Sequence, residues 1–437
     1  MKQRTKRSAF TIVAKNYIGL AKVLETSIRK HNSDIDFYIF VADELPSSFG
    51  EKMPDNVIES KNVLSYSDKE WVDMTFKYTL TEFCTAIKPS CFQYLFECKD
   101  YEKAIYLDPD IYVFDSLTNI YETIDKYSIL VTPHIVFPIV DDNSDRVFLQ
   151  SGPYNLGFLG LRNSEVSKNM LVWWRKKLLE NCYDDVLDYT FTDQKWMLMI
   201  HSYFPQTEIC VCRNIGLNVA PWNFKERKFI KKESGFKVEC RNNSSISERL
   251  VFIHYSGYDY KALLDGREIR PRVLEVDVDF ADVKMMMDFY SKALRENVDT
   301  MRSYLDLKYS YATYDNGYPI ETFHRRLYRR ISEVDGDVFI SPYSTTEGSL
   351  YKMIEQKRLM LNLSSSNGNV VPNNSQTSNK LKSFNRLMRF VFKLMGERRY
   401  LMLLRLMKHF SRYESQIFLL DDKYIKNNVK LPNKLTI

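Results

Sequence analysis

The sequence predicts an α/β fold, in which helices flank a mixed sheet, followed by a helical C-terminal extension. Short apolar runs alternate with stretches of helical periodicity in the first half of the chain, and beyond residue 270 the apolar residues recur at helical spacing. Strands that alternate with helices assemble into a sheet covered on both faces. At 437 residues, the chain has room for one large α/β domain and an extension.

The fold begins with a predicted βαβ unit. Ala9–Ala14 form a strand, Lys15–Tyr17 a turn and Leu20–His31 a helix, and a second strand at Phe37–Ala42 is closed by Asp43 and Glu44. We expect the two strands to be parallel. Ligands of open α/β sheets bind beyond the carboxyl ends of the strands, so the turn and Asp43 fall at the binding edge.

This unit has no glycine-rich phosphate loop. Neither GxGxxG nor GxxxxGK[ST] occurs in it. Their absence argues against a dinucleotide enzyme and against a P-loop NTPase. The diphosphate of a bound nucleotide would then be neutralised by a metal ion.

The string AIYLDPDIYVFD, residues 104–115, places two carboxylates at the end of a predicted strand. Pro109 prevents the chain from continuing as a helix. Asp108 and Asp110 therefore offer oxygen ligands at one spot, which suits Mg²⁺ or Mn²⁺. Asp-Pro-Asp is also common turn chemistry, so this pattern alone leaves both interpretations open.

Residues 79–100 predict a helix, or a helix pair broken near Pro89. Three cysteines, Cys84, Cys91 and Cys98, lie seven residues apart on its apolar stripe. Zinc ligands are usually closer in sequence, so we expect these cysteines in the core. Lys88, beside the break, could reach a phosphate, and an exposed surface lysine fits the pattern equally well.

The segment YNLGFLGLR predicts a buried strand that contains Asn155 and Gly157. Glycine inside a strand often marks the close approach of a ligand or another backbone. Ser164 then caps a long helix.

Two further motifs place polar residues at the start or the end of a predicted helix or strand. TDQKW predicts a helix start with Thr192 or Asp193 as the cap, from which Asp193 and Gln194 would project together toward the hydroxyls of a sugar. An Asp there is also an ordinary cap. In VFIHYSGYD, His254 ends an apolar strand and Gly257 opens a turn. A histidine in this position is either a packing residue or a metal ligand.

The order of these motifs resembles the GT-A glycosyltransferases, and within them the retaining enzymes related to glycogenin and bacterial α-galactosyltransferases. The strings LDPDIYVF, NLGFLGLR, TDQKW, NVAPWN and HYSGYD are similar to bacterial glycosyltransferases of surface polysaccharide synthesis. The resemblance extends to residue 260. It implies the GT-A fold, with Asp108, Asp110 and His254 holding Mn²⁺ or Mg²⁺. The chain departs from it after the HxxG motif, where Tyr258–Lys261 replace the frequent Lys-Pro-Trp.

The resemblance also implies roles for the other residues of this edge. A nucleotide-sugar donor, most simply a UDP-sugar, would be held by Ala14, Asn16, Tyr17, Asp43, Lys88, Asp108, Gly157 and Gly257. Asn155, Asp193 and Gln194 would surround the reacting sugar carbon. The expected reaction is hexosyl transfer to a glycan or lipid-linked acceptor with retention of configuration, although Asp193 could serve as an inverting base.

Two other functions fit a strand that ends in DxD. One is a HAD-like phosphatase, whose motif normally opens its domain, whereas here the motif follows a whole βαβ unit. The other is a non-catalytic scaffold that binds the donor.

The chain divides into four predicted parts: a catalytic domain at 1–270, a helical extension at 271–363, a flexible linker at 364–379 and a basic amphipathic helical tail at 380–437. The linker is polar and almost uncharged. Residues 380–413 contain ten Lys or Arg and one Glu, a net charge of +9, whereas the whole chain carries +6. The basic excess therefore belongs to the tail.

The pattern of residues in the tail predicts that it binds to an anionic membrane surface. Basic residues share one side of the first helix, and apolar residues share the other. The basic set is Lys382, Arg386, Arg389 and Lys393, and after Gly396 it continues with Arg405, Lys408 and Arg412. A helix hairpin packed on the rest of the chain or on a second copy is the alternative. Nucleic acid is not an expected partner, because no nucleic-acid motif appears.

We expect a cytoplasmic protein, peripheral on the inner face of the plasma membrane. The apolar stretch before Lys15 is too short for a signal peptide. No run approaches the roughly 20 apolar residues of a spanning helix. Seven cysteines, an odd number, fit reduced thiols.

Overall fold

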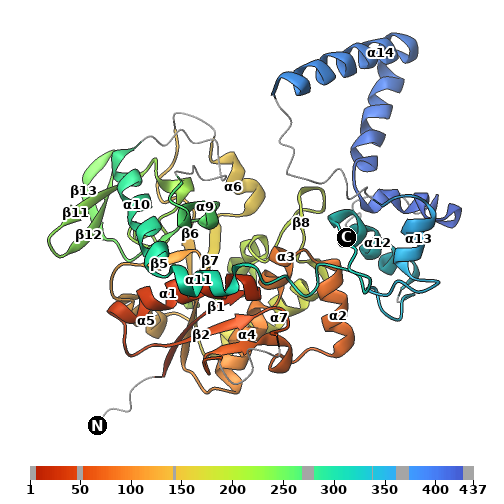
Figure 1. Ribbon diagram of the computed structural model, residues 1–437. Helices are drawn as coiled ribbons and strands as arrows, with labels where there is room; N and C mark the ends of the chain where they lie inside the picture. The colour runs from red at the N-terminus through yellow and green to blue at the C-terminus, as the bar shows by residue number, and fades with distance from the viewer. Residues whose placement is uncertain are drawn as a thin grey trace. The chain divides into compact units, whose positions relative to one another are not determined.

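The computed structural model describes residues 6–46, 53–140, 144–267, 280–336, 338–360 and 374–426. Side chains of its last long helix are described from residue 382. The chain forms two compact units, Met1–Tyr311 and Ala312–Ile437 (Figure 1).

The first unit is built on a seven-stranded mixed sheet, which confirms the predicted α/β class. The strand order is β10-β6-β7-β4-β1-β2-β3. Strand β7 runs antiparallel to both of its neighbours, and the other pairs are parallel. The strands are β1 (Arg7–Val13), β2 (Asp36–Val41), β3 (Val57–Glu59), β4 (Lys103–Leu107), β6 (Ile129–Pro133), β7 (Tyr154–Arg162) and β10 (Ile209–Val211).

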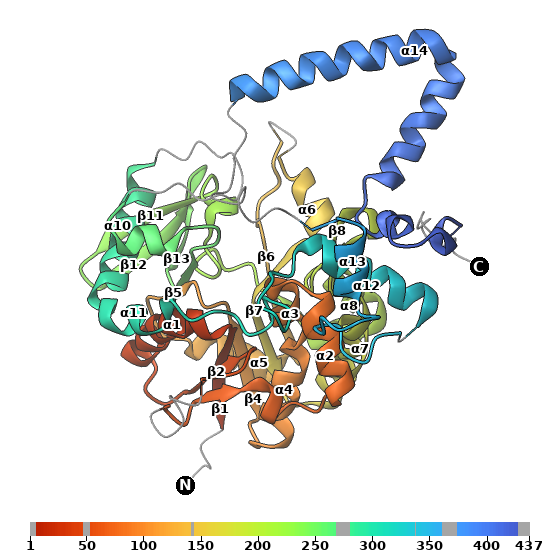
Figure 2. The same cartoon turned by 45° about the vertical axis from the view of Figure 1, so that its right-hand side comes forward.

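Helices cover both faces of this sheet (Figures 1 and 2). Helices α1 (Ile18–His31) and α5 (Thr118–Lys126) pack on one face, against alternate residues such as Ala9 and Val13 of β1. Phe10, the neighbour of Ala9, points to the other face, where the centre of its ring lies 4.7 Å from that of Phe92 of α4 (Lys88–Glu97). Helix α7 (Glu165–Asn181) lies on this second face and begins at the predicted Ser164 cap. Alternate side chains of a strand point to opposite faces of the sheet, so each strand can pack against helices on both sides.

The predicted break near Pro89 separates α3 (Leu80–Ala86) from α4. Thr79 and Glu82 form a capping box at the start of α3. Cys91 is buried as predicted, and Cys84 is partly buried. The prediction is wrong for Cys98, which is exposed because α4 ends at Glu97 and Cys98 is its C-cap.

A second layer of the first unit carries the strand that ends in His254. Strand β14 (Phe252–His254) pairs antiparallel with β5 (Ile111–Val113). Next to them lies a small sheet of β11 (Arg227–Lys232), β12 (Gly235–Cys240) and β13 (Asn243–Arg249). Two helices, α10 (Ala281–Glu296) and α11 (Val298–Leu305), lie in the range that the sequence predicted as a helical extension.

The second unit is helical. It contains α12 (Thr322–Asp335), α13 (Leu350–Gln356) and α14 (Asn374–Phe410), followed by short 3₁₀ helices at Glu414–Leu419 and Asp422–Tyr424. Helix α14 is two helical segments joined at Gly396, whose φ of 72° breaks the helix. It begins inside the segment that the sequence predicted as a linker at 364–379, and residues 364–373 lie outside the described residues.

The segment after α14 packs within the second unit. Ile417, Leu420 and Tyr424 are buried. The Tyr424 hydroxyl donates to Asp335 Oδ2 of α12 at 2.7 Å. The prediction that Arg412 belongs to the exposed basic face is wrong: the helix ends at Phe410, and Arg412 turns inward, with its Nε 3.7 Å from Glu414 Oε2.

Among the residues that the structure describes, no helix combines the length and apolar character that crossing a bilayer requires.

Candidate functional site

The predicted acidic motif lies where β4 leaves the sheet. Asp108 follows the last residue of β4, and the chain turns at Pro109 into β5. The register of β5 with β14 sets His254 opposite Ile111, and Tyr255 N donates to Asp110 O at 2.9 Å. The β5–β14 ribbon therefore carries His254 to the Asp-Pro-Asp turn.

The side chains of Asp108, Asp110 and His254 converge. One ligand atom of each lies within 4.8 Å of the others. His254 Nε2 is 3.1 Å from Asp110 Oδ1 and 3.5 Å from Asp108 Oδ2. Burial alone would lower the pKa of His254, but the carboxylates of Asp110 and Asp108 outweigh it and raise this pKa. The structure therefore brings together the three residues that were expected to hold a metal ion.

The donor set of this cluster fits a hard divalent cation. Asp110 Oδ1 is buried and accepts no hydrogen bond from the described residues. The Tyr106 hydroxyl donates to Asp108 Oδ1 at 2.5 Å, which leaves Oδ2 directed at His254. Two carboxylate oxygens and an imidazole nitrogen are ligands that Mn²⁺ accepts. A buried oxygen without a donor is the position at which a cation would stabilise the site.

Asn155 and Gly157 lie on β7 and meet His254. Asn155 Oδ1 accepts from Gly157 N at 3.1 Å and lies 3.2 Å from His254 Nδ1. Asn155 Nδ2 donates to Gln194 Oε1 at 3.3 Å. Asp108 N donates to Gly157 O at 2.8 Å, which joins β7 to the acidic turn. These hydrogen bonds therefore link Asn155 and Gly157, the NxG motif of β7, to His254 of the cluster.

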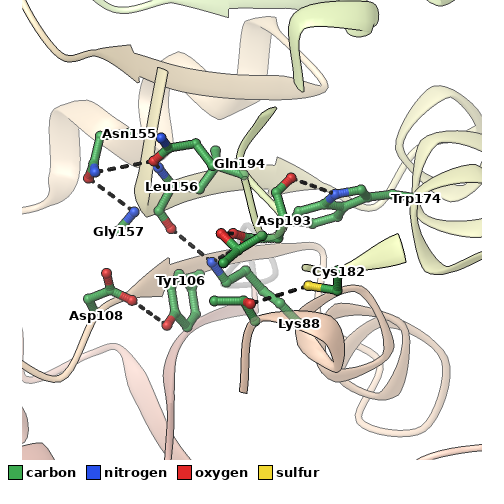
Figure 3. Close-up of polar contacts among 12 residues, drawn as sticks. Lys88, Tyr106, Asp108, Asn155, Leu156, Gly157, Trp174, Cys182, Asp193 and Gln194 are labelled. Carbon is green, nitrogen blue, oxygen red and sulfur yellow. Dashed lines mark hydrogen bonds and ion pairs between the residues drawn. The ribbon is translucent and has the colours of Figure 1, made fainter. Parts of the chain in front are cut away.

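Lys88 and Asp193 form a buried ion pair, drawn in Figure 3. Lys88 Nζ lies 2.5 Å from Asp193 Oδ2 and donates to Leu156 O at 2.9 Å. The side chains are only 1% and 3% exposed, so the alternative of a surface lysine is wrong. The ammonium also lies 4.0 Å from the centre of the Tyr106 ring. Lys88 therefore connects α4, β7 and the TDQKW segment.

The TDQKW segment differs from its prediction. A 3₁₀ helix spans Lys195–Met199, and its N-cap residue is Gln194, with no side-chain cap bond. Thr192 and Asp193 are not caps because Asp193 is turned to Lys88 and Thr192 has a φ of 45°. The Gln194 amide accepts from Leu156 N at 3.2 Å and donates to Ser151 O at 2.9 Å. Asp193 and Gln194 thus both turn into the protein, where their side chains bond to Lys88, Leu156 and Ser151.

A cavity of about 310 Å³ opens beside the acidic turn. Its walls are mostly aromatic and apolar, and Tyr17 faces Tyr260 across 5.1 Å between ring centres. Its lining includes Ala14, Tyr17, Cys84, Tyr106, Asp108, Asp110, Tyr255, Tyr258, Tyr260 and Tyr290. The tyrosines that replace Lys-Pro-Trp after the HxxG motif thus form part of this cavity.

Five predicted donor-binding residues do not line this cavity: Asn16, Asp43, Lys88, Gly157 and Gly257. Asp43 is buried, and its carboxylate accepts from Lys15 N at 2.8 Å and Ser310 N at 3.0 Å. It therefore ties the β1 turn to the segment after α11. Asn16 keeps a buried Oδ1 without a hydrogen-bond partner among the described residues. Gly257 has a φ of 76°, as the predicted turn requires.

Sequence reasoning missed a group of residues behind His254. Asn218, with a φ of 50°, donates through Nδ2 to Asn155 Oδ1 at 3.1 Å and to Thr132 Oγ1 at 2.9 Å. The Trp222 ring lies edge-on to both His134 and His254, at 5.3 Å from each. Asn218 and Trp222 belong to the NVAPWN string. This string is part of the family resemblance, but the resemblance gave it no role in the site. His134 lies in a segment with no recognisable motif.

A protein-family model matches the first part of the chain. Residues 9–164 match the model of glycosyl transferase family 8. Two Bacillus subtilis (strain 168) proteins, YfnF and YfnD, both described as uncharacterized, are 22% and 23% identical over 296 residues. Each match covers 67% of this chain, with 93% of YfnF and 90% of YfnD.

The chain is also similar to solved glycosyltransferase structures. A galactosyltransferase LgtC, in complex with donor and acceptor sugar analogs, is 14% identical with a TM-score of 0.41, over 69% of this chain and 97% of LgtC. Mouse xyloside xylosyltransferase 1 is 12% identical with a TM-score of 0.34, over 58% of this chain and 98% of the mouse protein.

Proposed function

We propose that this glycosyltransferase, whose residues 9–164 carry the family 8 match, transfers a hexose from a UDP-sugar to a glycan or lipid-linked acceptor in bacterial surface polysaccharide synthesis. Glycosyl transfer from a nucleotide-sugar donor is the activity of the chain. The convergence of Asp108, Asp110 and His254 beside the aromatic cavity carries the finer proposal. The cavity would take the nucleoside, and the cluster would face its diphosphate.

The three residues of the cluster would hold Mn²⁺ or Mg²⁺. When bound, the cation supplies Lewis-acid stabilisation of the charge that develops on the departing diphosphate. The chain's own residues do the rest. Tyr17 and Tyr260 pack against each other in the cavity wall, where they would contact the base, and the Asp108 carboxylate is oriented by the Tyr106 hydroxyl. Asn155 and Gln194 are joined to each other by a hydrogen bond and would lie beside the donor sugar.

The ion pair of Asp193 with Lys88 supports a retaining reaction. An inverting transferase needs a base that removes a proton from the acceptor. The Asp193 carboxylate is buried and occupied by the Lys88 ammonium at 2.5 Å, so it is not free to contact an acceptor hydroxyl. We propose that Asp193 orients the donor sugar and that Lys88 fixes the position of its carboxylate. The configuration of the product, read by NMR, tests this: an inverted anomeric centre would contradict it.

Donor hydrolysis without an acceptor tests the proposed function. The purified full-length chain is incubated with a panel of nucleotide sugars and Mn²⁺, and release of free sugar and nucleoside diphosphate is measured. We expect slow hydrolysis of one UDP-sugar. Phosphate release from simple phosphoesters would instead indicate a phosphatase, and inactivity toward both would indicate a scaffold.

For the second unit, we propose binding to an anionic membrane surface through residues 380–413. The four cations Lys382, Arg386, Arg389 and Lys393 are exposed. Large apolar side chains of the same helix are exposed as well, among them Leu387, Phe390 and Leu394. A helix that combines these two sets lies in the headgroup region, where each cation contributes about 1 kcal/mol. The enzyme would then act at the cytoplasmic face, near lipid-linked acceptors.

Vesicle sedimentation tests the membrane proposal with a matched control. One variant changes the four helix cations to Gln, and another changes Leu387, Phe390 and Leu394 to Glu. The control removes four exposed lysines from the β11–β12 hairpin instead: Lys228, Lys231, Lys232 and Lys237. Both helix variants should fail to bind phosphatidylglycerol vesicles at low salt, and the control variant should bind them as the wild type does. Wild-type protein that ignores the vesicles but self-associates through α14 would favour the helix hairpin.

A further inference from the structure

We infer that Asn155 and Gly157 are positioning residues for His254: together they form a seat that fixes the imidazole ring and keeps its Nε2 lone pair directed at the cation position. This inference rests on the proposed metal site. It gives the NxG motif a role different from the contact with the donor sugar that the resemblance implied. Three features of the site support this role: the fixed Asn155 oxygen, the histidine tautomer and the missing side chain at Gly157.

The first feature is the orientation of the Asn155 amide. The atom assigned as Oδ1 lies 3.1 Å from Gly157 N, whose backbone N–H can only donate. The atom in this position must therefore be the carbonyl oxygen, and the amide cannot be turned round. Asn218 Nδ2 donates to the same oxygen at 3.1 Å. The opposite end of the amide donates to Gln194 Oε1 at 3.3 Å, which fits this orientation.

The second feature is the tautomer of His254. The fixed oxygen of Asn155 lies 3.2 Å from His254 Nδ1. An acceptor in this position requires a proton on Nδ1, so the neutral ring carries its lone pair on Nε2. That nitrogen lies 3.1 Å from Asp110 Oδ1 and 3.5 Å from Asp108 Oδ2. The hydrogen bond to Asn155 thus leaves the metal-binding nitrogen on the side of the two carboxylates.

The third feature is the space that glycine leaves. A Cβ at position 157 would lie 2.4 Å from His254 Cε1 and 2.6 Å from its Nδ1. The Gly157 backbone cannot give way, because its N–H bonds to Asn155 and its carbonyl accepts from Asp108 N at 2.8 Å. The imidazole ring would have to move instead. Glycine is required here by the histidine ring, which is the close approach that a glycine in a strand often marks.

Binding of Mn²⁺ to the full-length protein without donor tests the seat. The electron paramagnetic resonance signal of free Mn²⁺ gives the dissociation constant independently of turnover. Partners that orient a metal-bound histidine typically contribute 10–100-fold to metal affinity. We therefore expect Asn155→Leu and Gly157→Ala each to weaken Mn²⁺ binding by at least about tenfold. Asn155→Asp keeps an acceptor oxygen and should bind Mn²⁺ far better than Asn155→Leu.

Thr132→Val is the matched control. Thr132 accepts from Asn218 in the same buried network but has no hydrogen bond to His254. This near-isosteric change should leave the Mn²⁺ dissociation constant within about twofold, because the Asn155–His254 bond remains. A loss equal to that of Asn155→Leu would mean that general disturbance of the network, not the seat, lowers the affinity.

A double variant separates positioning from direct ligation. In a His254→Ala background, Asn155→Leu should cause no further loss of Mn²⁺ affinity, since Asn155 acts only through the histidine. An additional loss would overturn the inference, as would wild-type affinity in Asn155→Leu. If Asn155→Leu fails to fold, Gly157→Ala decides in the same assay. Wild-type protein that binds no Mn²⁺ would instead contradict the proposed metal site itself.

Discussion

The carboxyl end of β4 and helix α14 depart from the usual distribution of side chains in opposite directions. At the end of β4, charged groups are buried, and Lys88 is 1% exposed in its ion pair with Asp193. In α14, large apolar side chains face solvent: Phe390 is 63% exposed and Leu394 74%. Charged groups are rarely buried without partners, and apolar patches on a surface often mark a contact site.

The difference lies in how each region offsets its unfavourable groups. At the end of β4, Lys88 and Asp193 bond to each other, and the proposed cation would stabilise the buried Asp110 Oδ1. Within the described residues, no ion pair or hydrogen bond of this kind compensates for the exposed apolar side chains of α14. We propose that a lipid surface covers them. Polar substitutions should therefore act on catalysis and stability in the first region, and on surface binding in the second.

The largest effect is expected at Asp110. Asp110→Asn keeps the shape of the side chain and removes the charge that holds the cation. Because the Lewis-acid contribution is several kcal/mol, hexosyl transfer should fall about a thousandfold or more. The thermal unfolding temperature should stay close to that of the wild type. An Asp110→Asn protein with normal turnover at limiting Mn²⁺ would remove Asp110 from the site.

The buried ion pair should matter for folding. Lys88→Met leaves the Asp193 carboxylate buried without its cation, which typically costs about 3–5 kcal/mol of unfolding free energy. The double variant Lys88→Met/Asp193→Leu removes both charges and should be more stable than Lys88→Met alone. Urea denaturation measures both. A single variant as stable as wild type would mean that Asp193 is neutralised in another way.

A buried histidine behind the site should make the first unit acid-sensitive. Burial lowers the pKa of His134 to about 4. The unfolded chain, with an ordinary histidine pKa near 6.5, then binds protons first, so stability falls as pH drops from about 6.5 to 4. His134→Phe should reduce that loss by up to about 3 kcal/mol. The check is the difference between the two proteins in urea denaturation across this range; parallel curves would contradict it.

The smallest effect on stability is expected in α14. Leu387→Glu and Phe390→Glu change exposed side chains, so the free energy of unfolding should shift by about 0.5 kcal/mol or less. Donor hydrolysis should be unchanged while vesicle binding is lost. As a contrast in the core of the first unit, Leu107→Glu at the fully buried end of β4 should prevent folding. A large destabilisation by the α14 changes would indicate that this face is packed in solution.

The sequence predicted the elements whose signals are local. The apolar runs of β1, β2 and β4, the Ser164 cap and the break before α4 all follow from short-range patterns, and the structure has them. The Asp-Pro-Asp turn after β4 was predicted in the same way, whereas the grouping of His254 with Asp108 and Asp110 came from the family resemblance.

What the sequence could not predict depends on long-range geometry. Lys88 reaches Asp193 across 105 residues, and a lysine at a helix break carries no sign of its partner. Asn218 adopts a left-handed backbone conformation, which asparagine tolerates and no motif announces. Arg412 continues the basic pattern in sequence, yet the helix has already ended at Phe410. In each case the decisive contact is with a residue far away in the chain or beyond an element end.

The central claim is that Asp108, Asp110 and His254 hold the cation that faces the donor diphosphate. Anomalous diffraction from crystals grown with Mn²⁺ and a UDP-sugar would test it most directly. We predict a manganese peak within bonding distance of one oxygen of each aspartate and of His254 Nε2, with the diphosphate as a further ligand. A peak bound by other residues, or a diphosphate held with no metal between these three side chains, would contradict the account.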